Sequence, residues 1–443
     1  MLKQISLALA LLSGLFATQT YFTDRASQNS LLIPIDNLND EELDKFYLGK
    51  SFFRIPWVEA PSATTARDGL GALFNANSCT SCHKKNGEGD VYNKNGFTSR
   101  SLVVRLSIDS NKSEYRDILE KDGFIPEPNY GSQLSINSVH GVKPEGKAEV
   151  KYQKIAVKLS ENETVTLNKP IVSLKDLNYG ELNKSINISL RKAPALIGLG
   201  LIESISDREI LKNVDESDKN GDGISGKANY IYSKETNKTE LGRYTYKASS
   251  SSIKLQSALA LHNDMGLTTD ILPFENCTKS QKACLNAPKG VDIDVPNHRL
   301  EAIEFYLTNL KTYRAKETKE FRENRELFNK IGCVKCHVDS FETKKGFKIA
   351  PYSDFLLHDM GEGLSDGRSE FLAEKNEWRT TPLWGISIRK KLKKNLTYLH
   401  DGRAKSLKEA ILWHGGEAEA SKEAFKNLPK VKREKIIKFL GEL

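Results

Sequence analysis

Cys79-Thr80-Ser81-Cys82-His83 begins a pattern that the chain repeats as Cys333-Val334-Lys335-Cys336-His337. Cys-x-x-Cys-His is the attachment motif of c-type haem, in which two thiols add to the porphyrin vinyl groups and the histidine binds the iron. Cys-x-x-Cys alone is also compatible with a zinc half-site or a redox pair. Both copies end in histidine, and Leu-Phe-Asn precedes both at the same distance, at 73–75 and 327–329. The sequence therefore predicts two covalently bound c-type haems, with His83 and His337 as iron ligands.

The N-terminus indicates export. Lys3 is followed by an apolar run at 5–17, which is typical of a signal peptide and short for a membrane helix. We expect a signal peptide at 1–20, with an uncleaved anchor as the alternative, and no membrane segment after its removal. Because c-type haem is attached outside the bacterial inner membrane, the motifs also favour a periplasmic protein.

The remaining two cysteines, Cys277 and Cys284, are close in sequence. In an oxidising compartment such a pair is expected to form a structural disulfide, with a redox-active pair as the alternative. The net charge of +8 would be roughly halved by four haem propionates, so we expect no nucleic-acid partner. A basic patch would instead suit an acidic electron-transfer partner.

Internal repeats indicate a tandem duplication. The segment Arg191–Leu196 is answered by Arg379–Trp384, and further matches follow in the same order as far as His262 and His414. We predict a mainly α fold of two tandem cytochrome c-like domains, at 21–290 and 291–443. Alternating apolar residues predict a β insertion near 131–180 in the first domain.

A separate loop at 215–226 has the composition of a calcium site. Asp218, Asn220 and Asp222 alternate before Gly223, as in the first half of an EF-hand loop, and Asp215 is a further possible ligand. The closing glutamate is absent, because the twelfth position is Asn229. We predict calcium binding, with an ordinary acidic turn as the alternative.

Six stretches together resemble the bacterial di-haem oxidoreductase family, some of whose members are labelled "thiol oxidoreductase". They are Phe74–Cys79, Asp215–Gly226, Asp264–Gly266, Leu357–Gly361, Trp378–Gly385 and His400–Ala404. That family is similar to di-haem cytochrome c peroxidases and MauG enzymes. The resemblance implies a peroxidatic haem in the N-terminal domain and an electron-transfer haem in the C-terminal domain.

The resemblance also implies distal residues. In the related peroxidases the helix after His-Asp-Gly supplies a methionine to the electron-transfer haem, and here His414 stands at that position. His/His ligation would lower the potential of that haem. In the first domain the matching helix offers Gln256 and then Asp264 as catalytic residues, and Asp264 is suited to transferring a proton to and from peroxide. His262 and Met265 are alternative ligands that would close this iron.

The predicted function is an exported di-haem oxidoreductase of the cytochrome c peroxidase type. The C-terminal haem would relay electrons to the N-terminal haem, where peroxide or another small oxidant is reduced, and a cytochrome or cupredoxin would donate them. The alternative is a non-enzymatic electron-transfer cytochrome. A third hypothesis, thiol oxidation, depends only on Cys277 and Cys284.

Overall fold

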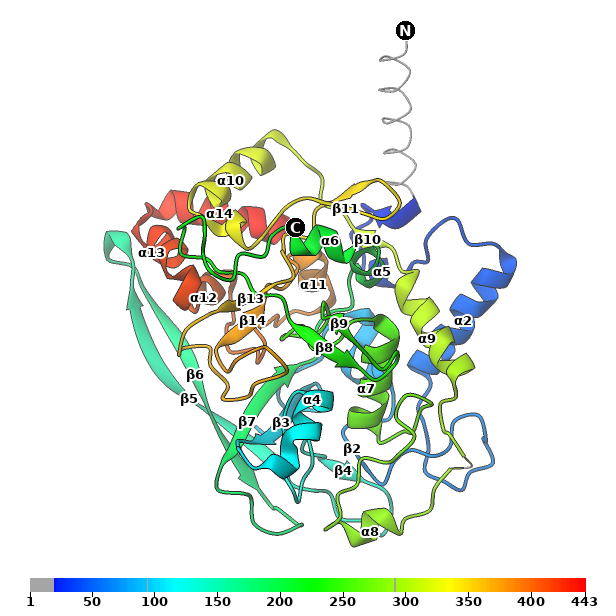
Figure 1. The fold of residues 1–443 in the computed structure, drawn as a ribbon. Helices are drawn as coiled ribbons and strands as arrows, with labels where there is room; N and C mark the ends of the chain where they lie inside the picture. Colours follow the sequence, from blue (N-terminus) through cyan, green and yellow to red (C-terminus); the bar gives the residue numbers. More distant parts are fainter. Residues whose placement is uncertain (1–19, 94, 291) are drawn as a thin grey trace.

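The computed structural model describes residues 20–93, 95–290 and 292–443 (Figure 1). The predicted signal peptide at 1–20 lies outside the described residues apart from Thr20. None of the helices in these ranges combines the length and hydrophobicity that a membrane crossing requires.

The longer helices are α2 (Asp40–Arg54), α7 (Ile253–Met265), α9 (Asn297–Thr308), α10 (Lys319–Lys330), α13 (Glu419–Asn427) and α14 (Lys430–Glu442). The shorter ones are α3 (Cys79–Cys82), α4 (Arg116–Asp122), α5 (Leu199–Glu203), α6 (Asp207–Leu211), α8 (Lys282–Leu285), α11 (Ile386–Leu392) and α12 (Leu407–Leu412). Six 3-10 turns in the described ranges include η4 (Ser160–Asn162) and η5 (Cys333–Lys335).

The strands form separate two-stranded ladders. The long antiparallel pairs are β5 (Lys147–Lys158) with β6 (Thr164–Lys175), and β3 (Leu102–Ile108) with β7 (Ile186–Lys192). The short antiparallel pairs are β2 (Leu73–Phe74) with β4 (Asn137–Ser138), β8 (Tyr230–Ser233) with β9 (Lys238–Leu241), β11 (Phe341–Glu342) with β12 (Lys348–Ile349), and β13 (Leu357–Asp359) with β14 (Glu377–Arg379). β1 (Phe22–Thr23) pairs in parallel with β10 (Thr312–Tyr313).

The expectation of a mainly α fold is wrong. Helices take up 31% of the chain and strands 20%, spread over several small sheets. The predicted hairpin is present as β5 and β6, but β3, β7 and the short ladders were not anticipated. Strands of two to four residues are too short to show a period of two, so the sequence pattern does not reveal them.

The first core is built on the pair α2 and α9, with α7 packed beside α9. α2 begins with a capping box in which Asn39 and Glu42 bind each other's backbone N–H groups. The two helices approach closely at Gly49, where a Cβ atom would lie 1.8 Å from the Ala302 carbonyl oxygen. The predicted boundary at 290/291 assigns α9 to the second unit, whereas its contacts are with the first.

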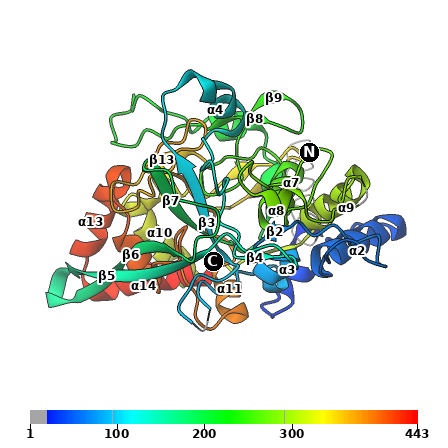
Figure 2. The same ribbon diagram turned by 90° about the horizontal axis from the view of Figure 1, so that it is seen from below.

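The second core contains α10, α12 and α14, whose apolar faces meet around Phe321, Phe328 and Phe439. Figures 1 and 2 both show this group beside α13 and away from α2 and α9. α10 begins at a cap in which the Thr318 side chain accepts the Phe321 N–H.

The β5–β6 hairpin belongs to the first half of the chain but completes the second core. Leu159 and Leu167 pack into that core, and Ser160 Oγ at the tip donates to the Leu428 carbonyl at 2.5 Å. Glu163 forms ion pairs of 2.7 Å with Lys408 and Arg433. The hairpin therefore ties the two halves together, as Figure 2 shows.

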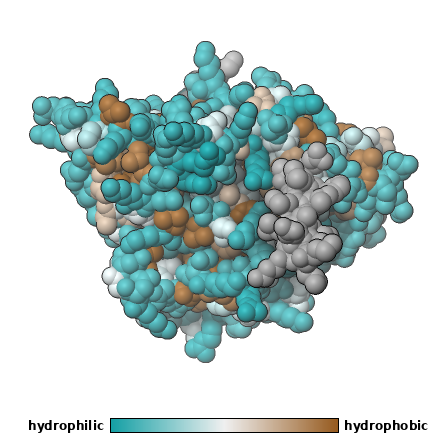
Figure 3. All heavy atoms as spheres, turned by 90° about the horizontal axis from the view of Figure 1, so that it is seen from above, coloured by the Kyte–Doolittle hydropathy of each residue, from teal (hydrophilic) through white to brown (hydrophobic). Residues whose placement is uncertain are grey.

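The face seen in Figure 3 is mostly hydrophilic, with small apolar patches between polar side chains. Small patches of this kind are ordinary on a protein surface in water. A further, mainly apolar surface lies inside, around the cavity described next.

Candidate functional site

One cavity of about 1140 Å³ is lined by both Cys-x-x-Cys-His motifs. Its walls come from both cores, and they also include Gln256, His262, Asp264, Met265, Met360, Trp378, Trp384, His400 and His414. The fold therefore brings into one space every residue predicted to attach, ligate or act beside a haem.

The first motif forms α3, one short helical turn beneath α2. His83 Nδ1 lies 2.8 Å from the Pro194 carbonyl oxygen and donates to it, which leaves Nε2 as the free ring nitrogen. Burial lowers the pKa of His83, so the imidazole is neutral and able to bind a metal. Burial also raises the pKa of Cys79 and of Cys82 to about 12, which keeps both thiols protonated.

The second motif repeats this arrangement in η5. His337 Nδ1 donates to the Tyr352 carbonyl oxygen at 2.8 Å, and burial lowers the pKa of His337 to about 4. Cys333 and Cys336, like the cysteines of the first motif, form no disulfide. Each motif thus presents two thiols and one oriented, neutral imidazole.

His414 follows α12 and lines the cavity. Its Nδ1 donates to the Ala410 carbonyl oxygen at 2.8 Å, and burial lowers its pKa. A charge on His414 would lower the pKa of His337 further, so the two imidazoles lie near each other. His414 therefore has the orientation and neutrality of the two motif histidines.

Helix α7 presents the predicted distal residues of the first motif. Gln256, His262 and Asp264 line the cavity, and Met265 lines it while packing in the first core with 2% of its surface exposed. Asp264 Oδ1 accepts a hydrogen bond of 2.8 Å from Gln133 Nε2. The backbone carbonyl of Asp264 accepts the N–H groups of Asn75 and Ala76, just before the motif. These bonds hold α7 against the first motif.

His262 differs from the other cavity histidines. Its ring lies edge-on to Phe274, with centroids 5.4 Å apart, and its buried Nδ1 has no hydrogen-bond partner among the described residues. Burial, with the charge of Lys234, lowers its pKa to about 4. The imidazole is neutral, although a hydrogen bond with the Phe274 backbone raises its pKa against these two effects.

Aromatic residues occupy the wall between the motifs. Trp378 stacks on His400 with ring centroids 3.7 Å apart, and two cations, Arg191 and Lys247, lie over the Trp378 ring at 4.5 and 4.3 Å. Tyr246 meets His400 edge-on at 6.4 Å. Trp384 and Tyr244 also line the cavity and belong to the first core.

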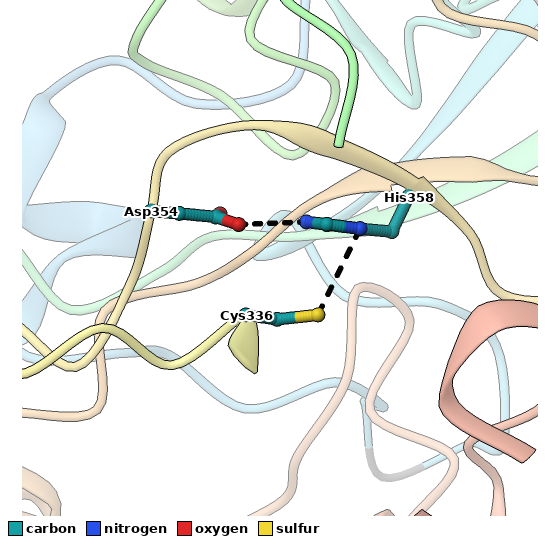
Figure 4. A group of neighbouring side chains, drawn as sticks. All are labelled: Cys336, Asp354 and His358. Atoms are coloured by element: carbon teal, nitrogen blue, oxygen red, sulfur yellow. Dashed lines mark hydrogen bonds and ion pairs between the residues drawn. The ribbon is translucent and has the colours of Figure 1, made fainter. Parts of the chain in front are cut away.

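A buried clamp beside the second motif was missed by sequence reasoning. Figure 4 shows Asp354 and Cys336 on either side of the His358 ring. His358 Nε2 lies 2.8 Å from Asp354 Oδ2, and Nδ1 lies 2.6 Å from Glu417 Oε2 and 3.7 Å from Cys336 Sγ. Although burial lowers the pKa of His358, the two carboxylates raise it well above its usual value. Both ring nitrogens of His358 are therefore engaged by carboxylates.

Buried cations line the same cavity. Arg191 and Arg389 each have a buried nitrogen without a hydrogen bond, Nη2 and Nε respectively, and Lys192 pairs with the buried Glu88. Haem carries two carboxylates, so buried cations with unused N–H groups in a cavity with two attachment motifs fit that group. Arg191 was noticed in the sequence only as part of a repeat, because nothing local marks it as cavity-facing.

The 215–226 loop lies against the second motif. Asp215 accepts the backbone N–H groups of Lys219 and Asn220, and Asp218 accepts those of Asp222 and Gly223. Asp222 Oδ2 lies 3.2 Å from Lys335 Nζ. The predicted calcium ligands are thus gathered by their own backbone, next to the second attachment site.

Cys277 and Cys284 form a disulfide at α8. Cys277 also lines the cavity, near the end of α7.

A protein-family model described as "Di-haem oxidoreductase, putative peroxidase" matches residues 13–443. No curated protein and no solved structure matches this chain.

Proposed function

This chain belongs to the di-haem oxidoreductase family, and from that premise we propose that it is an exported c-type cytochrome with peroxidase activity. Cys79 and Cys82 attach one haem, and Cys333 and Cys336 attach the other. His83 and His337 are the proximal ligands. The protein works in the periplasm, where a cytochrome or cupredoxin supplies electrons.

The observation that carries this proposal is the shared cavity. Two attachment motifs that lie far apart in sequence line one space, and each offers an imidazole held by a backbone carbonyl. Such a hydrogen bond fixes the ring and raises the basicity of the nitrogen that binds the metal.

Haem supplies one-electron chemistry, and an iron with an open sixth position also supplies peroxide reduction. The side chains beside each attachment motif determine at which of the two sites that position would be open. His414 is oriented and neutral, so it would hold the second haem together with His337, and a haem held by two histidines would serve electron transfer. Electrons then pass from the second motif to the first.

Helix α7 carries the carboxylate that would transfer a proton at the first site. Gln133 fixes the Asp264 carboxylate, whose charge acts on Cys79, Cys82 and His83. A carboxylate at this place can hold the proton that peroxide releases and return it to the leaving oxygen. Gln256 lies two turns earlier on the same helix and lines the same wall.

One observation favours the second candidate, a non-enzymatic electron carrier. His262 is neutral, lines the cavity and has a free Nδ1. If His262 closes the first site, both irons are six-coordinate and the protein only transfers electrons.

Calcium binding at Asp215, Asp218, Asn220 and Asp222 is part of the proposal. The ion pair between Asp222 and Lys335 supports a role in holding the second motif in place. Oxygen ligands at alternate positions suit Ca²⁺.

Peroxide reduction by the purified haem-loaded protein, with a reduced cytochrome as donor, tests the proposal. Asp264→Asn should lower kcat about 10²–10⁴-fold, the usual contribution of a general acid–base, while the haem spectrum stays unchanged. Asp24→Asn, at an exposed position, is the matched control and should retain full activity. A wild type without turnover supports the carrier, and full activity in Asp264→Asn removes Asp264 from the mechanism.

A further inference from the structure

Two arginines share one face of the β3–β7 ribbon inside the cavity. In the antiparallel register Val103 faces Arg191 and Arg105 faces Ser189. Arg105 and Arg191 are therefore diagonal neighbours on one face, roughly 7–8 Å apart at the backbone. Both side chains line the cavity, and a guanidinium is long enough to meet its neighbour at a shared group.

The ribbon begins and ends at the first attachment motif. Ser101, just before β3, accepts the Ala193 N–H, just after β7. Cys82 Sγ donates to the Arg100 carbonyl at 3.1 Å, and His83 bonds to the Pro194 carbonyl. The two arginines thus lie only a few residues along the ribbon from the cysteine and histidine of the first site.

Both arginines have unused hydrogen-bond donors. Arg191 is 9% exposed and is paired with Asp366 through Nη1. Its buried Nη2 lies 3.5 Å from Glu370 Oε1 and makes no hydrogen bond. Among the residues that the structure describes, Arg105 has no hydrogen-bond or ion-pair partner for its guanidinium, although it lies within charge range of Asp264, Glu370 and Arg191.

The charges around the pair do not balance. Four cations, Arg105, Arg191, Lys247 and Arg368, face three carboxylates, Asp264, Asp366 and Glu370. A further carboxylate beside Lys247, Glu377, is paired with Lys227. One positive charge remains in a largely buried place, where an unpaired charge is costly. A planar guanidinium with free N–H groups matches the two oxygens of a carboxylate.

We propose that Arg105 and Arg191 bind a carboxylate group in the cavity beside the first attachment motif. A propionate of the haem attached there is one source of that group, and a small free carboxylate that enters the cavity is the other. The inference rests on the haem-binding part of the proposed function. It does not require peroxide turnover.

Arg105→Gln tests the pair, because Arg105 makes no contact on which folding depends, whereas Arg191 is tied to buried Asp366. The reduction potentials of both haems are measured by redox titration followed in the visible spectrum. If the carboxylate is a propionate, loss of Arg105 removes one of its two positive partners, and the less compensated negative charge favours ferric iron. At a fixed ambient potential we expect the ratio of ferrous to ferric iron in one haem to fall about tenfold. This corresponds to a reduction potential lower by about 59 mV for a one-electron couple. Arg105→Lys should recover most of the shift, and Arg208→Gln, at an exposed position on α6, should cause none.

Acetate titration of the haem-loaded protein separates the two sources. If a free carboxylate binds the pair, acetate changes the wild-type haem spectrum and Arg105→Gln abolishes the change. If a propionate already occupies the pair, acetate leaves the wild-type spectrum unchanged. If Arg105→Gln alters neither the potentials nor the response to acetate, the proposal is overturned. A protein that shows the potential shift but no peroxidase activity would contradict the proposed enzyme and leave the carboxylate site supported.

Discussion

Replacing His358 by leucine should destabilise the protein strongly, because it leaves two buried carboxylates without their cation. The side chains of His358 and Asp354 are each 2% exposed, and that of Glu417 is 13% exposed. Removing one partner of a buried ion pair costs about 3–5 kcal/mol. Leucine has a volume similar to that of histidine, so the loss of stability would come from the unpaired carboxylates and not from a cavity.

The pKa of Glu417 gives a second measure of the same interaction. Burial raises this pKa, but the hydrogen bonds from His358 and Ser225 lower it, from 4.5 to about 2. At 1.36 kcal/mol per pKa unit the shift is worth about 3 kcal/mol of stability. The two figures describe one interaction and are not additive.

The clamp also predicts the pH range in which the variant differs most from the wild type. The contribution of Glu417 is present above its unfolded pKa of 4.5 and is lost as pH falls toward 2. The pKa of His358 is raised, so its contribution is complete below about 6.5 and is lost as pH rises through the folded value. The stabilisation is therefore greatest between about pH 4.5 and 6.5.

Urea unfolding followed by tryptophan fluorescence at pH 5.5 and at pH 3 provides the assay. His358→Leu should lower the unfolding free energy by about 3–5 kcal/mol at pH 5.5 and by clearly less at pH 3. His140→Leu, at an exposed position, is the control and should stay within about 0.5 kcal/mol of the wild type. Equal stability of His358→Leu and wild type at pH 5.5 would refute the clamp.

Three further predictions concern the cofactors. Cys82→Ala should lose half of the haem stain after denaturing electrophoresis, and full stain would contradict attachment at the first motif. Calcium added to chelator-treated protein should raise the melting temperature, since oxygen ligands stabilise the loop, and Asp222→Ala should abolish the rise; a wild type that does not respond would make the loop an ordinary turn. His414→Gly should turn one low-spin haem high-spin, whereas His414→Met should keep it low-spin and raise its potential, because a thioether favours ferrous iron; unchanged spectra and potentials in both variants would make His414 structural.

The features predicted successfully from sequence are those written in consecutive residues. The hairpin is visible because its strands are twelve residues long and alternate. The two Cys-x-x-Cys-His motifs are likewise written in consecutive residues.

The features that were missed depend on residues far apart in sequence. His358 and Glu417 are separated by 59 positions, and Arg105 meets the region of Asp264 only through the bridge to Gln133. No local sequence pattern distinguishes an arginine that faces an internal cavity from one that is exposed to solvent. The expectation of a mainly α fold failed for a similar reason, because the short ladders form between segments that are brought together by the tertiary fold.

Electron paramagnetic resonance of the protein, fully oxidised and then half-reduced, tests most directly whether one site transfers electrons while the other is open to peroxide. If His414 closes the second site and α7 leaves the first open, as proposed, the half-reduced protein should show a high-spin ferric signal. That signal should respond to added peroxide and persist in Asp264→Asn. Two low-spin ferric signals in the oxidised protein, with no high-spin signal at any stage of reduction, would contradict a peroxidase and establish an electron carrier.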